Sequence, residues 1–306
     1  MKRSIVQHGA SSLTVTLPSG WVKKFGLKKG DEVNVTEKGP SVVISTEHET
    51  ETEKKTVDTT DFGLFTKNNL THVYMLGYDE VEITFDDEKT LQEIKKRVPE
   101  CIGFEIIDQK PNKVFIKSIA TALESEFDVM LRKSFLVTIE MGKEILEALK
   151  KKDYGKLKEL RHLESINNRF TICCARILNK RGYKNPKRTN QMYEIVKNIE
   201  RATDEYKHIC DIFSEENKDA KNTKLSKEIL DLFAEVNDYY YTFYQLFYKF
   251  QPELKKKVYL DRKKLIEKGK QILVKSKGKE TLLIHYLINF VNRTYDIAGP
   301  YFALIL

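Results

Sequence analysis

The sequence predicts a multidomain chain: a small β-rich domain at the N-terminus, a small α/β adaptor, and a large all-α region that runs to the last residue. Three observations predict this architecture. Residues 1–46 alternate short β-prone runs with turns that contain Gly or Pro, residues 62–118 mix strand and helix patterns, and residues 119–306 carry apolar side chains at spacings of three and four. A polar segment, residues 47–61, is expected to link the first two regions.

Composition limits the kind of protein and its partners. The chain has 306 residues, 41% of them hydrophobic, which is enough for two or three folded domains. Lys and Arg (53) exceed Asp and Glu (45) by eight, which favours an anionic partner. No apolar run reaches the roughly 18–20 residues of a membrane span. Four cysteines without a C-x-x-C pair suit a reducing compartment, so we expect a cytoplasmic protein.

The first 46 residues are expected to form two strands, a short helix and two more strands. Leu13, Val15 and Leu17 alternate with polar residues, the period of a strand with one buried face. Ser19 is a plausible N-cap for the helix, and Gly26 is the stop signal at its end.

This N-terminal region is too small to bury a sufficient core alone, so we expect it to dimerise with a second copy. Its seven basic residues exceed its three acidic ones, giving a net charge of +4. A two-fold, positively charged surface suits the phosphates of double-stranded DNA, although a solvated lysine-rich surface would have the same composition. The candidate DNA-binding residues are Lys2, Arg3, His8, Ser11, Ser12, Lys23 and Lys24.

The stretch RSIVQHGASSLTVTLPSGWVKKFGLKKGDEVNV (3–35) resembles the AbrB/SpoVT/MazE swapped-hairpin family. The shared features are the strand that ends in Leu17-Pro18, the helix end at Phe25-Gly26-Leu27 and the Gly30-to-Val33 turn. The resemblance implies an interleaved homodimer that binds DNA, as a transcription regulator or an antitoxin. The family often has an Arg shortly before the Leu-Pro strand end, where this chain has Leu13 and Thr14. Phosphate contacts are therefore expected rather than base recognition by arginine.

Residues 47–118 carry no catalytic signature. The segment EHETETEKKTVDTTD (47–61) is expected to be a linker or an exposed edge segment, because Val57 is its only aliphatic residue. In the adaptor that follows we expect a strand, a helix that ends at Pro99, and a hairpin. Their ranges are 81–85 for the strand, about 87–98 for the helix, and 104–107 with 113–118 for the hairpin.

The C-terminal region predicts a bundle of long helices with short connections. Two sets of three helices, with the similar motifs Ile199-Glu200-Arg201 and Val291-Asn292-Arg293, suggest an internal duplication with repeats at about 121–217 and 222–306. The expected helices span about 121–151, 154–180, 190–214, 224–250, 252–276 and 279–303.

Acidic residues on the third helix of the first set are candidate metal ligands. Glu200 and Asp204 are one turn apart, a spacing at which two carboxylates can hold a cation, although a solvated acidic flank has the same pattern. Glu205 and His208 match the Glu-x-x-His spacing of di-iron bundles. Both fall more than 100° from the apolar stripe of this helix, so we expect them on the solvent side and expect no di-iron centre.

Residues 121–306 resemble the PhoU family of duplicated three-helix bundles, through IERATDEYKHICDIF (199–213) and VNRTYDIAG (291–299). The resemblance implies a metal ion, either divalent or iron or zinc, at Glu200 and Asp204. In the second copy only Asp296 matches the motif, because Asn292 replaces the other acid. The whole chain resembles the PhoU-type phosphate uptake regulators of archaea that carry an AbrB-like head.

The combined prediction is a homodimeric transcription regulator of phosphate uptake that binds double-stranded DNA. The alternative is a regulator that contacts phosphate-transport or signalling proteins, with an N-terminal domain that only dimerises. Metal storage or redox chemistry in the bundle is a third option. No nucleophile–base pair, P-loop or G-x-G-x-x-G stands out, so we do not expect an enzyme.

Overall fold

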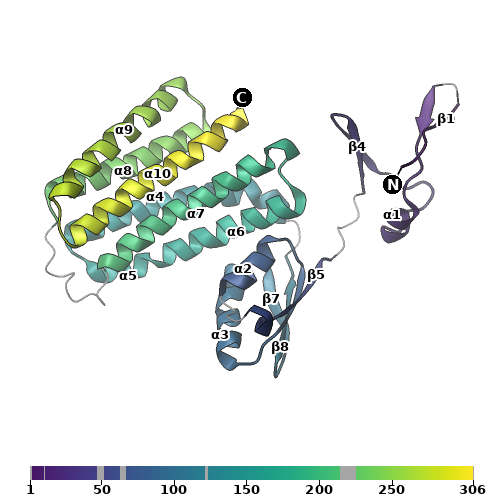
Figure 1. Ribbon diagram of the computed structural model, residues 1–306, viewed down its shortest axis with the longest axis horizontal. Helices are drawn as coiled ribbons and strands as arrows, with labels where there is room; N and C mark the ends of the chain where they lie inside the picture. The colour runs from purple at the N-terminus through teal and green to yellow at the C-terminus, as the bar shows by residue number, and fades with distance from the viewer. Residues whose placement is uncertain are drawn as a thin grey trace. The chain divides into compact units, whose positions relative to one another are not determined.

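The computed structural model describes most of the chain, namely residues 2–9, 11–46, 52–62, 67–120, 123–213 and 225–305. It divides into two compact units, Met1–Thr52 and Glu53–Leu306 (Figure 1). We call these the head and the body, and each is described by itself.

The head consists of two short antiparallel hairpins and one helix, in the predicted order. Strand β1 (Val6–His8) pairs with β2 (Ser12–Thr14), and β3 (Asn34–Lys38) pairs with β4 (Ser41–Ser45). The two pairs are separate two-stranded sheets, with helix α1 (Ser19–Lys24) between them in the chain. Gly26 has a φ of +62° and follows the helix, as its expected role as a stop requires. Ser19, however, is the first helical residue rather than the cap, because Pro18 takes the N-cap position.

The body begins with a four-stranded sheet of order β5-β6-β8-β7. Strands β5 and β6 are parallel, and the other neighbours are antiparallel. Val81 and Ile83 of β6 and Val114 and Ile116 of β8 turn their side chains to one face, which helices α2 and α3 cover (Figure 1). The elements are β5 (Lys54–Asp58), η1 (Thr59–Phe62), α2 (Lys67–Met75), β6 (Glu80–Thr84), α3 (Glu88–Arg97), η2 (Val98–Glu100), β7 (Phe104–Lys110) and β8 (Lys113–Ser118).

The start of this layer and one of its helices differ from the sequence-based expectation. Residues 54–58, expected to belong to a linker or an exposed edge segment (47–61), form the edge strand β5, as the second alternative implies, and Val57 is buried in the core of the layer. The folded layer therefore begins before residue 62. Helix α2 was not expected, although Leu70 and Tyr74 on it are fully buried and lie one turn apart.

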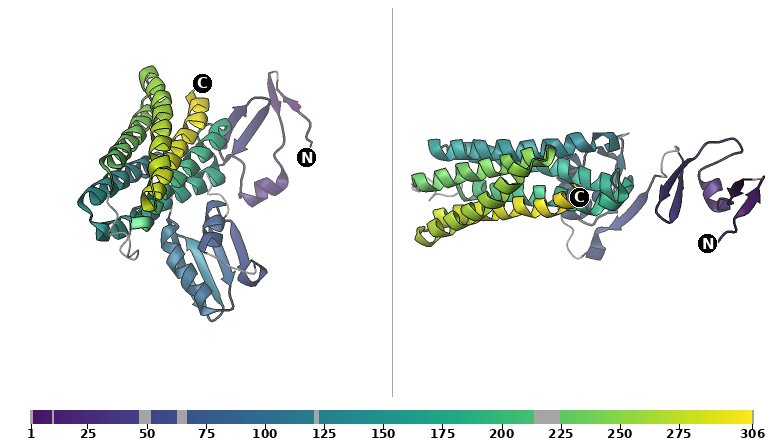
Figure 2. Two further views of the ribbon diagram at one scale, coloured as in Figure 1. Left: turned by 60° about the vertical axis from the view of Figure 1, so that its left-hand side comes forward. Right: turned by 90° about the horizontal axis from the view of Figure 1, so that it is seen from above.

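The remainder of the body is a bundle of long helices that share one apolar core (Figure 2). The second expected helix is divided at Arg161 into α5 and α6. Helix α4 packs on α6 and α8, and α7 packs along α10. The predicted internal duplication stays a prediction. The elements are η3 (Leu123–Glu126), α4 (Phe127–Lys151), α5 (Tyr154–Leu160), α6 (His162–Arg181), η4 (Pro186–Arg188), α7 (Thr189–Phe213), α8 (Lys227–Tyr248), α9 (Pro252–Lys275) and α10 (Lys279–Ile305). Positions 121, 122, 214 and 224 of the expected helices lie outside the described residues.

Within the part of the chain that the structure describes, none of the helices has the length and apolar character that crossing a membrane demands.

Arg176 of α6 fastens the bundle to the α/β layer. Its side chain is 4% exposed, and its Nη1 donates hydrogen bonds to the carbonyl oxygens of Tyr74 (2.8 Å) and Tyr78 (2.7 Å). Its Nη2 lies 2.7 Å from Oδ1 of Asp79, and its guanidinium stacks 4.8 Å from the ring centre of Tyr74. Because Ile172 of the same helix belongs to the core of the layer, the two parts of the body are joined by both apolar and polar contacts.

Replacing Arg176 with Ala should lower the free energy of unfolding of the body by about 3 kcal/mol, because the carbonyl oxygens of Tyr74 and Tyr78 and the carboxylate of Asp79 each lose one charged hydrogen-bond donor at once. Lys113→Ala is the matched control: it breaks the more exposed ion pair with Glu82 and should cost less than about 1 kcal/mol. Denaturant unfolding of both variants measures the difference, and equal decreases would show that Arg176 is not a major anchor.

Candidate nucleic-acid interface

The head has no core of its own. No side chain described between residues 2 and 46 is buried, and both apolar cores consist only of residues of the body. Leu13, expected on the buried face of a strand, is 71% exposed. The other large aliphatic side chains that are exposed in the head are Ile5, Val6, Val15, Val35, Val42 and Val43.

Leaving these aliphatic side chains in water lowers the stability of the folded head. An isolated two-stranded hairpin is at best marginally stable in water, and the head has two of them. Full burial of one Val, Leu or Ile side chain contributes about 1.5–3 kcal/mol. The seven aliphatic side chains named above form a surface whose coverage would supply the missing stability.

The predicted DNA-binding residues are exposed, and they lie on two elements and a terminal segment. His8 pairs with Ser12 across the hairpin, so both lie near its tip together with Ser11. Lys23 and Lys24 form the last turn of α1. Lys2 and Arg3 precede β1. Their role in binding stays a prediction.

Thr14, at one of the two positions where an arginine was expected, has a contact within the first hairpin. Its hydroxyl donates a 3.2 Å hydrogen bond to the carbonyl oxygen of Val6. Its side chain therefore joins the two strands of the first hairpin.

Residues 6–51 match the family described as "Antidote-toxin recognition MazE, bacterial antitoxin". The head is a MazE-like domain. This confirms the resemblance of the N-terminal segment, whereas the PhoU resemblance of residues 121–306 stays a prediction. No curated protein and no solved structure matches the chain significantly.

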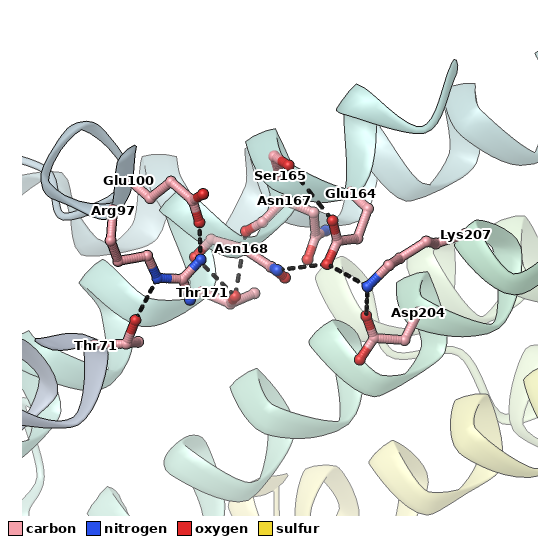
Figure 3. A network of polar contacts seen from close by, with 10 residues as sticks. All are labelled: Thr71, Arg97, Glu100, Glu164, Ser165, Asn167, Asn168, Thr171, Asp204 and Lys207. Atoms are coloured by element: carbon pink, nitrogen blue, oxygen red, sulfur yellow. Dashed lines mark hydrogen bonds and ion pairs between the residues drawn. The ribbon is translucent and has the colours of Figure 1, made fainter. Parts of the chain in front are cut away.

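The acidic residues of the body form a second candidate site, shown in Figure 3. Glu164 of α6 faces α7 and accepts a 2.6 Å hydrogen bond from Nδ2 of Asn168. The ammonium of Lys207 lies 3.3 Å from Oε1 of Glu164 and 3.8 Å from Oδ1 of Asp204. Glu200, one turn before Asp204, forms an ion pair with Lys197. Glu164 and Lys207 were not among the residues expected from the sequence, because their approach depends on how α6 packs against α7.

Partial burial dominates the electrostatics of this acidic cluster. It raises the pKa of Asp204 to about 6, Lys207 opposes the shift, and the nearby carboxylates of Glu164 and Glu200 add to it. The pKa of Asp204 therefore lies about two units above its ordinary value near 4.

A metal ion does not fit this cluster in its present arrangement. The ammonium of Lys207 already lies between the carboxylates of Glu164 and Asp204. Across the described ranges, no group of three or more His, Cys, Asp or Glu side chains is arranged to hold a metal ion. The divalent, iron or zinc ion expected at Glu200 and Asp204 stays a prediction, which elemental analysis of the purified protein would test.

At the segment expected to be the second copy of the motif, arginine side chains lie beside the candidate ligands. Oδ1 of Asn292 lies 3.2 Å from Nη2 of Arg262, whose guanidinium stacks 4.3 Å from the ring centre of Tyr295. Asp296, the expected ligand, lies 3.6 Å from Nη1 of Arg293. Arginine side chains therefore supply positive charge at this copy.

The expected position of Glu205 was wrong. This residue is 8% exposed, and its Oε1 lies 3.8 Å from Nε of Arg293 on α10. Helix α7 contacts α10 as well as α4 and α6. More of its circumference is therefore buried than the single apolar stripe in its sequence indicates. His208 is exposed as expected and stacks on Tyr286.

Asp204→Asn tests the electrostatics of the acidic cluster. When folding raises the pKa of a carboxyl, the protein loses stability as the pH rises. Here the loss occurs between the pKa of Asp204 in the unfolded chain, near 4, and its pKa in the folded protein, about 6. The Asn variant should therefore match the original protein near pH 4 and exceed its free energy of unfolding above pH 7. The gain should be at most about 1 kcal/mol, because the carboxylate still contacts water. Denaturant titrations at both pH values measure this, and a variant that is less stable above pH 7 would contradict it.

Proposed function

We propose that this chain is a dimeric DNA-binding regulator in which the heads of two copies assemble into one cationic domain that binds double-stranded DNA. The observation that carries the proposal is the MazE-like head, which is positively charged and lacks a core of its own. A MazE-like domain is consistent with a DNA-binding regulator.

Dimerisation explains the exposed aliphatic side chains of the head. A second copy would offer the same two hairpins, so Leu13 and its neighbours could be covered by their equivalents in a self-complementary interface. The body needs no such partner for its folding, because it contains two apolar cores of its own.

DNA is the partner that the charge of the head favours. Residues 1–46 of each head carry a net charge of +4, so these segments of a dimer would together present +8. Contacts from Lys23, Lys24 and the N-terminal Lys2 and Arg3 to phosphates would position the protein without reading the base sequence.

Regulation without catalysis is part of the proposal. All four cysteines are free and buried, and burial raises the pKa of Cys101 and Cys210 to about 12, far from that of a reactive thiolate. Four free thiols also support a cytoplasmic location.

The body would act as the sensor of this regulator, and phosphate uptake is the process that we propose it controls. The support is the resemblance of residues 121–306 to PhoU-type bundles. Phosphate-transport or signalling proteins would then be its further partners.

The dimer is tested by Leu13→Asp, which places a charge on the surface that the second copy would cover. We expect sedimentation of this variant as a monomer, because an unpaired charge in an apolar interface is strongly unfavourable. Thr16→Asp adds the same charge three residues later and should leave the dimer intact. A Leu13→Asp variant that sediments as a dimer would contradict the proposed interface.

DNA binding is tested by Lys23→Gln with Lys24→Gln in the full chain. Binding of a duplex should weaken, and the slope of log K against log salt should become shallower by roughly 0.9 for each phosphate that is no longer neutralised. Lys89→Gln with Lys143→Gln removes equal charge from the body and serves as control. If the head only dimerises, as in the alternative of a regulator that acts through protein contacts, the head variant will behave like the control.

A further inference from the structure

Helix α9 carries an unusual concentration of positive charge. Its 24 residues include nine Lys or Arg and three Asp or Glu, a net charge of +6, whereas the whole chain has a net charge of +8. The helix lies at the edge of the bundle and packs mainly on α8 and α10 (Figure 1). From the sequence, this segment was expected only to be a helix of the bundle.

The apolar side of α9 is used inside the body. Val258, Leu265, Gly269 and Ile272 are its buried residues. At Gly269 the contact with α10 is close, since a Cβ there would lie 2.8 Å from Cγ1 of Ile288. The helix therefore has a fixed orientation, with its opposite side turned to solvent.

That solvent side carries a line of lysines. Lys256, Lys263 and Lys270 are seven residues apart and exposed, so they lie on one stripe of the helix, with Lys264 beside it. Seven residues correspond to about 10 Å along a helix, which gives the stripe a length of about 21 Å. This is longer than the roughly 12 Å width of the major groove of B-DNA.

These four lysines are not neutralised within the described parts of the chain. Elsewhere on α9, Lys257 forms an ion pair with Asp261 and Lys268 with Glu235. None of the ion pairs among the described residues involves any of these four lysines, and the ammonium of Lys263 lies beside Tyr259, 4.6 Å from its ring centre. Their charge is available to a partner.

We propose that this solvent side of α9 binds the phosphate backbone of double-stranded DNA through Lys256, Lys263, Lys264 and Lys270. The inference rests on the proposed function, to which it adds a second contact region outside the head. It predicts affinity without sequence preference, because ammonium groups on phosphates carry no base information.

An anionic membrane is the less suitable partner. A helix that lies in a membrane surface buries a continuous apolar face in the lipid, and the apolar face of α9 is already packed in the bundle. On the solvent side, Leu260 (50% exposed) and Val274 (87% exposed) are separated by Glu267, so the exposed apolar surface there is interrupted by a charge.

The test is a triple variant of the full chain, Lys256→Gln with Lys263→Gln and Lys270→Gln, measured by fluorescence anisotropy on a labelled duplex at several salt concentrations. The matched control is Lys89→Gln with Lys143→Gln and Lys151→Gln, which removes the same charge from scattered exposed sites. Surface changes of this kind barely alter stability, so both triples should fold. We expect the α9 triple to make the slope of log K against log salt shallower by about 3 per protomer, and the control to leave it unchanged.

Equal slopes for the α9 triple and its control would overturn the inference. If the Lys23 and Lys24 variant still weakens binding in that experiment, the proposed function is retained while the α9 contact is rejected. If neither variant differs from its control, both the proposed DNA binding by the head and the α9 contact are rejected. Weaker binding of the α9 triple to vesicles of phosphatidylserine and phosphatidylcholine, with its DNA slope unchanged, would also overturn the inference and assign the helix to a membrane surface.

Discussion

The first fifty residues of this chain have nothing within the described structure that covers their apolar side chains. Leu13, Val35 and Val42 sit on short hairpins that pack on no third layer, and a folded domain cannot keep such surface in water at little cost. Covering them by a second copy ties folding of the head to association. The two-fold symmetry and the doubled charge that DNA binding needs would follow from the same event.

The body, unlike the head, is stabilised by apolar cores of its own. Helix α6 contributes side chains to both of these cores, and Arg176 on this helix donates hydrogen bonds to two carbonyl groups of the α/β layer. A body that is folded in the monomer and a head that orders on dimerisation would make DNA occupancy depend on protein concentration. A second cationic surface on α9 would strengthen that occupancy, because two linked contacts bind more tightly than either alone.

Local patterns in the sequence account for much of the fold. Alternation around Leu13 predicts the first hairpin, Gly26 the end of the short helix, and spacings of three and four the long helices. The features that the sequence did not predict are those whose position depends on packing between separate elements. Strand β5 is a polar edge strand with one buried aliphatic residue, and Glu205 is buried because α10 covers a second side of α7. The ammonium of Lys207 between two carboxylates depends likewise on the approach of α6 to α7.

Hydrogen exchange of the full chain, followed by mass spectrometry at increasing protein concentration, tests the coupling of folding to association most directly. Backbone amides of β1 to β4 should gain protection as the concentration rises, while amides of the body keep theirs throughout. Protection of the head that is complete in dilute, monomeric protein and independent of concentration would contradict the account.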